Sequence, residues 1–265
     1  MPAELYTNAL GQQVANIQLL LINPNCTTAF TDEIADYLTP RLPADVGITF
    51  YTPPGDAPKS IDGPTDGVLS TSVVLRDLLQ KGTDGESAGV DKVERGYSGV
   101  IVSCFSAHPL VPVLKEIFDG RPQAPPVVGI MESSVLAALQ LGPTFGIATT
   151  GPQWEPLFDE AVRSLGISSG RYTGTKGTGF SAISLHGAGP ADALLQASVD
   201  LVAKGARVII LGCAGMAPMR ASLEADLAKK SGRHVPVIDG VQAAVDAAIG
   251  YARMGIGRTF KPASE

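Results

Sequence analysis

The sequence has few residues of the types that build disulfide frameworks and metal sites. Three cysteines and three histidines occur among its 265 residues. Because three cysteines cannot all pair, and the chain shows no secretory signal, we expect reduced thiols rather than a disulfide framework. No Cys-x-x-Cys or His-Glu-x-x-His spacing is present, and His108, His186 and His234 are scattered along the chain. We therefore expect no bound metal.

Clusters of positive charge and long apolar runs are also missing. The formal net charge is −6 and no basic run occurs, whereas a nucleic-acid surface needs clustered Lys and Arg. No apolar stretch approaches the roughly 20 residues that cross a bilayer, and residues 1–8 lack the pattern of a secretory signal. We expect a soluble cytoplasmic protein that binds neither nucleic acid nor membrane.

Glycine-rich phosphate loops are absent as well. Neither a Gly-x-Gly-x-x-Gly motif nor a Walker-type loop can be found in the chain. Nucleotide and phosphate cofactors therefore have no support. We expect a protein that uses no cofactor and whose partner is a small-molecule substrate.

The chain does contain a regular alternation of short β-branched runs and amphipathic stretches, typical of βα units around a parallel sheet. With 45% hydrophobic residues it can bury a substantial core. We expect strands at 17–22, 47–51, 99–103, 127–130, 145–149, 207–212 and 235–238. We expect helices at 27–38, 67–80, 110–118, 133–141, 155–165, 191–204, 216–230 and 241–252.

An internal repeat organises these elements. Gly-Val-Ile-Val-Ser-Cys (99–104) matches Val-Ile-Ile-Leu-Gly-Cys (208–213), and a Pro-Val-Val motif at 126 matches Pro-Val-Ile at 236. The offsets, 213 − 104 = 109 and 236 − 126 = 110, are nearly equal. The alternative is the general similarity of all α/β segments. The repeat favours an α/β fold of two similar lobes with parallel sheets, related by a pseudo-twofold axis.

The expected boundaries follow from this repeat. Residues 1–131 plus 240–265 form the first lobe, and residues 132–239 form the second. Two stretches look irregular: 81–96 is polar and reads as a surface insertion without chemistry, and 166–189 is rich in glycine. A loop as long as the latter often acts as a lid or a binding loop.

The two matched cysteines, Cys104 and Cys213, carry the strongest functional signal. Each follows a buried strand, and ligands of open α/β sheets collect at that carboxyl edge. A free thiol titrates near 8.5, and a helix N-terminus lowers this value. Two thiols on opposite faces of one molecule could remove and return a proton beside a carbonyl. The alternative is that each cysteine is a small buried hydrophobe.

Other candidate residues lie near the same strand ends. Asn23 and Asn25 follow the first strand and Thr149 and Thr150 follow its counterpart, where amides and hydroxyls suit an anion or a polarised carbonyl. Ordinary helix capping is the alternative for both loops. The small residues Ala214 and Gly215, after Cys213, would let backbone approach a ligand.

Several further residues have weaker cases. His108, four residues after Cys104, could line the site, although sequence spacing alone does not establish a Cys–His pair. Glu132 is better explained by capping of a helix N-terminus. Cys26 has no counterpart in the second half of the chain, so we expect it to be structural or incidental. The weakest candidates for the site are Lys176, Arg220 and Asp239.

Taken together, the motifs resemble those of the aspartate/glutamate/hydantoin racemase superfamily, most closely the hydantoin racemases and their allantoin-racemase-like fungal relatives. They are Leu-Ile-Asn-Pro-Asn-Cys-Thr (21–27), Val-Ser-Cys-Phe-Ser-Ala-His-Pro-Leu (102–110), Gly-Ile-Met-Glu (129–132), Phe-Gly-Ile-Ala-Thr-Thr (145–150) and Ile-Leu-Gly-Cys-Ala-Gly-Met (210–216). They occur in the family's order across most of the chain, and the two cysteine motifs are the specific ones.

The resemblance implies two similar Rossmann-like (flavodoxin-like) lobes with the active site in the cleft between them. It further implies no cofactor, a homo-oligomer, and Cys104 and Cys213 as the acid/base pair. It also implies that the loop of Asn23 and Asn25, the backbone after each cysteine and the Thr149–Thr150 turn hold the substrate. After the first cysteine, that backbone comprises Phe105 and Ser106. One departure stands out: hydantoin racemases commonly continue with Phe-Gly-Asp-Pro here, whereas this chain has Phe-Ser-Ala-His-Pro (105–109).

The leading hypothesis is therefore cofactor-independent racemisation of a 5-substituted hydantoin or a related cyclic ureide such as allantoin. Cis–trans isomerisation or decarboxylation of a small diacid is a second hypothesis, but it calls for convergent cations that the candidate loops lack. A third is a non-catalytic small-molecule sensor on the same two-lobed scaffold.

Overall fold

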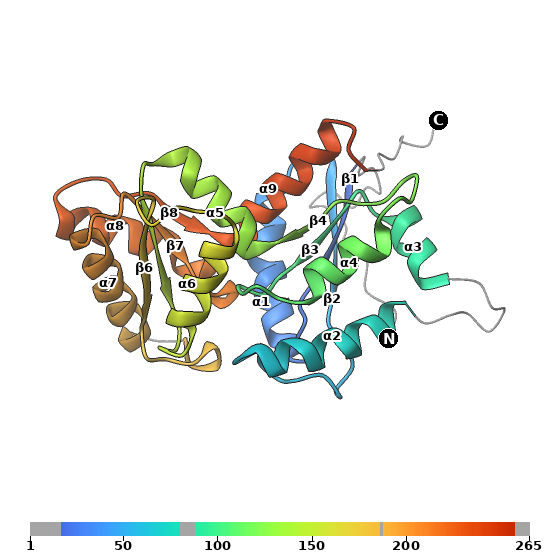
Figure 1. The fold of residues 1–265 in the computed structure, drawn as a ribbon, viewed down its shortest axis with the longest axis horizontal. Coiled ribbons are helices and arrows are strands. Elements are labelled where there is room, and N and C mark those ends of the chain that lie inside the picture. Colours follow the sequence, from blue (N-terminus) through green and yellow to red (C-terminus); the bar gives the residue numbers. More distant parts are fainter. Residues whose placement is uncertain (1–16, 80–87, 186–187, 258–265) are drawn as a thin grey trace. The chain divides into compact units, whose positions relative to one another are not determined.

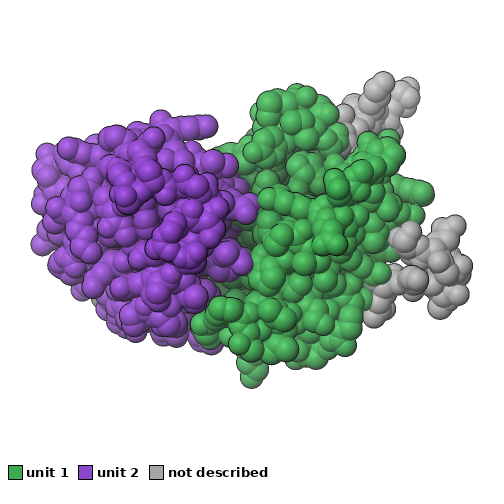
Figure 2. Space-filling model, in the orientation of Figure 1, with its two compact units in different colours: residues 1–104, 108–129, 244–265 green, residues 105–107, 130–243 purple. Residues whose placement is uncertain are grey.

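A computed structural model describes residues 17–79, 88–185 and 188–257. The chain divides into two compact units, which Figure 2 colours separately. The first unit comprises residues 1–104, 108–129 and 244–265, and the second comprises residues 105–107 and 130–243. Each unit contains one four-stranded sheet.

The first unit is built on a parallel sheet in the order β2-β1-β3-β4. Its strands are β1 (Ile17–Ile22), β2 (Val46–Tyr51), β3 (Gly99–Val102) and β4 (Val127–Gly129). Its helices are α1 (Thr28–Leu38), the short η1 (Thr39–Arg41), α2 (Pro64–Leu78), α3 (Ala88–Gly96) and α4 (Leu110–Phe118). All four residues of β3 are buried, as an apolar strand covered on both faces requires.

Alternation along the strands assigns side chains to the two faces of this sheet. Leu20, Ile22, Val100 and Val102 share a core with residues of α2, α3 and α4, so these helices cover one face. On the opposite face, a Cβ at Gly99 would lie 3.4 Å from the Cβ of Ala248, a residue of the last helix.

The second unit repeats this plan with the order β6-β5-β7-β8, again all parallel. Its strands are β5 (Phe145–Thr149), β6 (Tyr172–Gly177), β7 (Val208–Leu211) and β8 (Val237–Asp239). Its other elements are α5 (Ile130–Leu141), α6 (Trp154–Ser164), η2 (Ala182–Ser184), α7 (Ala188–Ala203), η3 (Ala214–Met219) and α8 (Arg220–Ser231). The last helix, α9 (Gly240–Arg253), starts in this unit.

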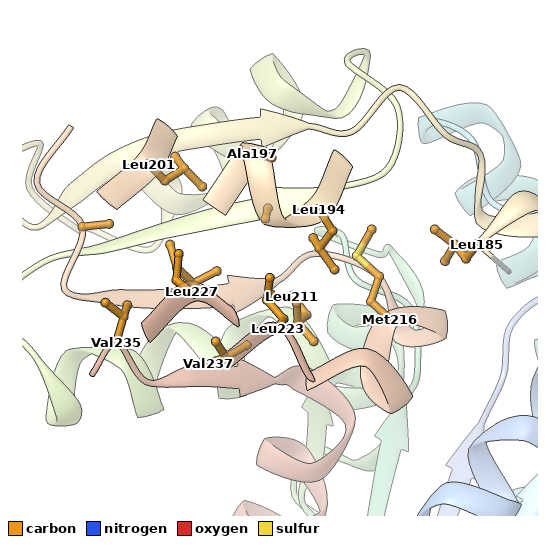
Figure 3. Close-up of a cluster of buried hydrophobic side chains, with 13 residues drawn as sticks. Leu185, Leu194, Ala197, Leu201, Leu211, Met216, Leu223, Leu227, Val235 and Val237 are labelled. Atoms are coloured by element: carbon orange, nitrogen blue, oxygen red, sulfur yellow. The ribbon is translucent and has the colours of Figure 1, made fainter. Parts of the chain in front are cut away.

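One face of the second sheet packs against α7 and α8. Figure 3 shows Leu194, Ala197 and Leu201 of α7 in one cluster with Leu211 of β7, and residues of α8 and β8 lie below them in this view. The ribbon in Figure 1 shows the same succession of strands and helices within each unit. The predicted α/β class with two parallel sheets is therefore confirmed.

Strand register establishes the internal repeat residue by residue. In the first sheet Ile22 pairs with Val102, and in the second Ala148 pairs with Leu211. On the other side of the same strands, Val102 pairs with Gly129 and Leu211 pairs with Asp239. Val102 and Leu211 therefore occupy equivalent positions in the two sheets, as the alignment of the two cysteine strands predicts.

Two stretches expected to be irregular contain regular structure. Strand β6 lies within 166–189, and helix α3 lies within 81–96, although residues 81–87 and 186–187 fall outside the described part of the chain. Strand β6 is an edge strand with a break in register between Phe145 and Ile147, and Gly174 within it has φ +106°. Such a glycine-rich, half-polar strand lacks the alternation that sequence reasoning relies on.

A second correction concerns the helix expected at 216–230. The structure has two pieces there, the 3-10 helix η3 and then α8. Pro218 lies inside η3, where it cannot donate a backbone hydrogen bond, so the α-helix begins only at Arg220.

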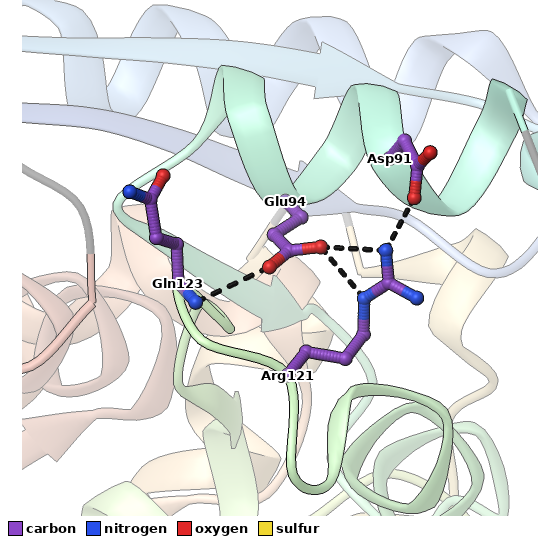
Figure 4. A network of polar contacts seen from close by, with 4 residues as sticks. All are labelled: Asp91, Glu94, Arg121 and Gln123. Carbon is purple, nitrogen blue, oxygen red and sulfur yellow. Dashed lines mark hydrogen bonds and ion pairs between the residues drawn. The ribbon is translucent and has the colours of Figure 1, made fainter.

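An ionic network holds α3 to the chain that follows α4 (Figure 4). Arg121 Nε donates to Glu94 Oε2 at 2.6 Å, and a terminal guanidinium nitrogen of Arg121 contacts Asp91. The backbone N–H of Gln123 donates to Glu94 Oε1 at 3.2 Å. Glu94 is buried, so these bonds compensate the desolvation of its carboxylate. Among the described residues, no helix is long and apolar enough to cross a membrane.

We expect Glu94→Gln to lower the free energy of unfolding by about 1–3 kcal/mol, because Arg121 loses its buried charge partner. Urea denaturation would measure this change. The matched control is Glu160→Gln, whose ion pair with Arg163 has side chains 65% and 67% exposed, and which we expect to cost less than about 0.5 kcal/mol. Equal effects of the two substitutions would contradict a stabilising role for the network.

Candidate active site

Cys104 and Cys213 occupy the same position in their own units. Each lies two residues beyond the last pair of the central strands, Ile22 with Val102 and Ala148 with Leu211. Both are partly buried, and none of the chain's three cysteines, all of which are described, forms a disulfide. Because the strands are parallel, each thiol lies at the carboxyl edge of its sheet, where ligands of open α/β sheets bind.

In the first unit, Asn23 follows β1 at this edge and organises the loop around it. Its amide nitrogen donates to Thr31 Oγ1 at 2.9 Å and to the carbonyl oxygen of Thr27 at 3.3 Å. Its Oδ1 accepts the backbone N–H of Asn25 at 3.2 Å. The side chain of Asn23 is buried, and these hydrogen bonds join it to other residues of the protein.

Asn25 continues the same turn and remains partly exposed. Its Oδ1 accepts the backbone N–H of Thr27 at 3.0 Å, while Thr27 Oγ1 donates to the carbonyl oxygen of Lys59. Thr27 is the N-cap residue of α1 but its side chain makes no capping bond. The first N–H groups of α1 therefore receive no side-chain cap from Thr27, although the N–H of Phe30 donates to its carbonyl oxygen at 3.2 Å.

In the second unit, Thr149 and Thr150 take the position that Asn23 and Pro24 take in the first. Thr149 Oγ1 donates to the carbonyl oxygen of Gly212 at 2.8 Å, which ties β5 to the residue before Cys213. The carbonyl oxygen of Thr150 accepts the backbone N–H groups of Thr178 and Gly179 at 2.8 and 3.0 Å. Both threonines are buried, and the hydroxyl of Thr149 is hydrogen-bonded to the backbone of Gly212.

Gly212 is required by the close approach of two strands. A Cβ at this position would lie 2.7 Å from Thr149 Cβ and 2.9 Å from Ile147 Cγ2. The equivalent position in the first unit holds Ser103, whose buried hydroxyl has no hydrogen-bond partner among the described residues. The two thiols thus follow residues of different chemistry.

Cys213 is the N-cap residue of η3, with extended backbone (φ −156°, ψ 137°). The N–H groups of Ala214 and Gly215 open this helix and so have no acceptor within it. Ala214 and Gly215 are partly exposed, like Cys213 itself. A polarised carbonyl oxygen beside the thiol could accept these N–H groups.

Comparison with known proteins shows the family of this chain. Residues 19–248 match the Asp/Glu/hydantoin racemase family. The chain belongs to that family. It is 35% identical to "Uncharacterized protein C1F7.10" of Schizosaccharomyces pombe, over 91% of this chain and 94% of that one. It is 31% identical to a hydantoin racemase of Pseudomonas sp. (strain NS671), over 86% of this chain and 83% of that one.

The fold agrees with this assignment. An allantoin racemase from Klebsiella pneumoniae superposes with a TM-score of 0.74, covering 94% of this chain and 95% of that one at 24% identity. At this identity the likeness shows the shared fold. The family identifies the protein as an isomerase of the racemase type.

In this racemase, His108 is buried, with a relative exposure of 1%. Its Nδ1 accepts the backbone N–H of Leu110 at 3.2 Å and thereby caps α4. The proton therefore sits on Nε2, which donates to Ser70 Oγ at 3.1 Å. Burial lowers the pKa of His108 to about 4. The ring is neutral near pH 7 and joins α2 to α4.

Phe105 and Ser106 differ in their surroundings. The Phe105 ring is buried and meets the Phe158 ring edge-on, with 5.2 Å between the centroids. A Cβ at Gly240 would lie 3.4 Å from this ring. The side chain of Phe105 is thus part of the second unit's core, whereas Ser106 is partly exposed.

The weaker candidates have structural partners. Asp239 accepts the backbone N–H groups of Val241 and Gln242 at 2.9 and 3.1 Å and caps α9. Arg220 pairs with Glu224 at 2.8 Å. Glu132 lies in the first turn of α5, as capping predicts, and Lys176 lies on β6 beside Ala148. Over the described ranges, no group of three or more His, Cys, Asp or Glu could hold a metal ion.

Sequence reasoning missed one residue of the second unit that lies close to Cys213. A Cβ at Gly215 would lie 3.2 Å from Leu185 Cδ1 and 3.9 Å from Cys213 Sγ. Leu185 is buried in the core that Figure 3 displays, together with Met216. In the sequence Leu185 is one of several apolar residues in its stretch, with Phe180 and Ile183, and nothing singles it out.

The burial of His108 predicts that the protein becomes less stable as the pH is lowered. In the folded protein the His108 ring takes up its second proton only near pH 4, whereas in the unfolded chain it does so near pH 6.5. Between these values the unfolded chain binds more protons, so the free energy of unfolding falls as pH drops, by about 3 kcal/mol in total. Urea denaturation at pH 7.5 and 5 would measure this slope.

The control compares two histidine variants. We expect His108→Asn to reduce this pH dependence, and His234→Gln to retain it, because the side chain of His234 is 69% exposed. The same slope in both variants would show that His108 does not titrate as the structure indicates.

The contact at Gly212 predicts a position intolerant of any side chain. We expect Gly212→Ala to destabilise the protein by about 1–3 kcal/mol, because the new methyl group must displace Thr149 or Ile147. Gly55→Ala is the matched control, since its Cβ would meet nothing within 4 Å, and we expect it to change stability by about 0.5 kcal/mol or less. Chemical denaturation of both variants checks this, and a neutral Gly212→Ala would contradict it.

Proposed function

We propose that this protein is a cofactor-independent racemase of 5-substituted hydantoins or of a related cyclic ureide such as allantoin, with Cys104 and Cys213 as the two bases. The observation that carries the proposal is the equal placement of the two thiols, each two residues beyond matching pairs of the central strands. Family membership supports the reaction class, and the relative named a hydantoin racemase supports the substrate class.

The chemistry needs a base on each side of one carbon. In a hydantoin, C5 lies between a carbonyl carbon and a ring nitrogen and bears a weakly acidic hydrogen. One cysteine, as thiolate, removes this proton and becomes a thiol, and the electron pair of the broken C–H bond moves into the enolate. The other cysteine, as thiol, gives its proton to the opposite face of C5 and becomes a thiolate. The product is the other enantiomer, and the two cysteines have exchanged roles.

The enolate oxygen needs hydrogen-bond donors in place before it forms. We assign this role to the N–H groups of Ala214 and Gly215, and contacts to ring amides to Asn25, Ser106 and Thr150. In this proposal the side chains of Asn23 and Thr149 position the loops, because their hydrogen bonds are made within the protein. His108 likewise positions α4 and holds no proton that is exchanged.

A neutral ring suits this set better than a diacid. The residues proposed to touch the substrate carry thiol, hydroxyl and amide groups, with no guanidinium or ammonium among them. Two carboxylates would require convergent cations to offset their desolvation. The proposed substrate is therefore neutral or weakly acidic.

The test follows one enantiomer of allantoin and of 5-substituted hydantoins in D₂O, by optical rotation and by the NMR signal of the hydrogen on C5. We expect loss of rotation together with deuterium uptake, above the uncatalysed rate. Cys104→Ser and Cys213→Ser should each lower the rate of inversion by about 10²–10⁴-fold, because each removes one acid/base group.

Cys26→Ser is the matched control, because Cys26 is also partly buried and has no counterpart in the repeat. It should leave the rate within about twofold of the unmodified protein. Inversion at the rate of the unmodified protein in either Cys104→Ser or Cys213→Ser would overturn the two-base mechanism. A lack of exchange on every ureide, with turnover of a small diacid, would overturn the substrate class.

A further inference from the structure

The segment from Thr178 to Leu185 is anchored to the same turn that Thr149 and Thr150 form. The backbone N–H of Thr178 lies 2.8 Å from the carbonyl oxygens of both Thr149 and Thr150, and that of Gly179 donates to Thr150 at 3.0 Å. All of these residues belong to the second unit. The segment therefore starts at the carboxyl edge of the sheet that also carries Cys213.

Its far end is fixed by a local cap and by the core. Ser181 and Ser184 form a reciprocal capping box around η2, with the N–H of Ser181 donating to Ser184 Oγ at 3.1 Å. Leu185, 7% exposed, then enters the core beside Met216, and Phe180 packs against the same core. Figure 3 shows Leu185 and Met216 at the end of this core. We call the segment from Thr178 to Leu185, which is held at these two places, the wall.

This wall lies next to the Cys213 thiol. Cys213 itself packs against the same hydrophobic core. A Cβ at Gly215 would lie 3.2 Å from Leu185 Cδ1 and 3.9 Å from Cys213 Sγ. A leucine methyl group and the thiol thus both lie within contact distance of the place that a side chain at Gly215 would take, and Leu185 leaves little room for a Cβ there.

We infer that Leu185 is a specificity-determining residue: its side chain forms the apolar wall against which the substituent at C5 of the substrate packs when Cys213 faces that carbon. The inference rests on the proposed function and adds to it the chemistry of the substituent. An apolar wall favours an alkyl or aryl substituent, since it offers no partner to a charged or hydrogen-bonding group. Its fixed position limits the size of that substituent.

The experiment measures kcat/KM for hydantoins with methyl, isobutyl and benzyl substituents at C5. In Leu185→Ala, the ratio of benzyl to methyl should rise at least about tenfold, because one or more carbon positions in a pocket are worth about 10–200-fold. Leu223→Ala is the matched control: it truncates a buried leucine of the same core. It should lose stability while its substrate ratio changes less than about twofold.

Gly215 supplies an independent variant. The methyl group of Gly215→Ala would lie 3.2 Å from Leu185 Cδ1 and 3.9 Å from the thiol, so kcat/KM should fall most for the largest substituent. Adding Leu185→Ala to this variant should recover part of the loss, because it removes the methyl group that the new Cβ meets. Independent effects of the two substitutions would contradict a shared pocket.

A binding assay separates failure of this inference from failure of the proposed function. Hydantoins with two alkyl groups at C5 have no hydrogen there and cannot be racemised, so calorimetry reports their affinity alone. Racemisation by the unmodified protein, with neither substrate ratio nor affinity altered in Leu185→Ala, would overturn the inference and leave the proposed function standing. Affinity that depends on Leu185 without racemisation of any ureide would overturn the proposed function and leave Leu185 as a residue that selects the ligand. Neither binding nor turnover would overturn both.

Discussion

The structure depends on the pairing of parallel central strands, β1 with β3 and β5 with β7. Parallel pairing brings the carboxyl ends of neighbouring strands to one edge. It places the loop after β1 near Cys104 and the loop after β5 near Cys213, although each pair is far apart in the sequence. The bond from Thr149 Oγ1 to the carbonyl oxygen of Gly212 spans 63 residues and joins two such loops directly. Helix packing on both faces keeps the strands in this register.

The central strands could be predicted because they are continuous apolar runs. β3 and β7 are buried along their whole length, so the sequence leaves little choice of structure there. β6 and α3 could not be predicted in the same way. β6 is a half-polar edge strand with glycines, and α3 contributes Val93 to the core while Glu94 and Asp91 bind Arg121. Their stability comes from partners distant in sequence.

For the candidate site, sequence reasoning found the loops but not the task of each side chain. Asn23 and Thr149 are at the expected strand ends, yet both make hydrogen bonds within the protein. The capping of α4 by His108 is local and could be read from its spacing to Leu110, whereas its bond to Ser70 depends on tertiary packing. Leu185 is brought to Gly215 by the path of the chain after β6, which no local pattern encodes.

The difference between Ser103 and Gly212 has a consequence for kinetics. A racemase must interconvert two mirror-image molecules of equal energy, so its kcat/KM values in the two directions are equal at equilibrium. The residues before the two thiols are not mirror images: one carries a buried hydroxyl and the other has no side chain. In the proposed two-thiol mechanism, the two enantiomers therefore meet different surroundings. Because the equilibrium constant is 1, kcat/KM is the same in both directions. If kcat is larger in one direction by some factor, KM must be larger in that direction by the same factor.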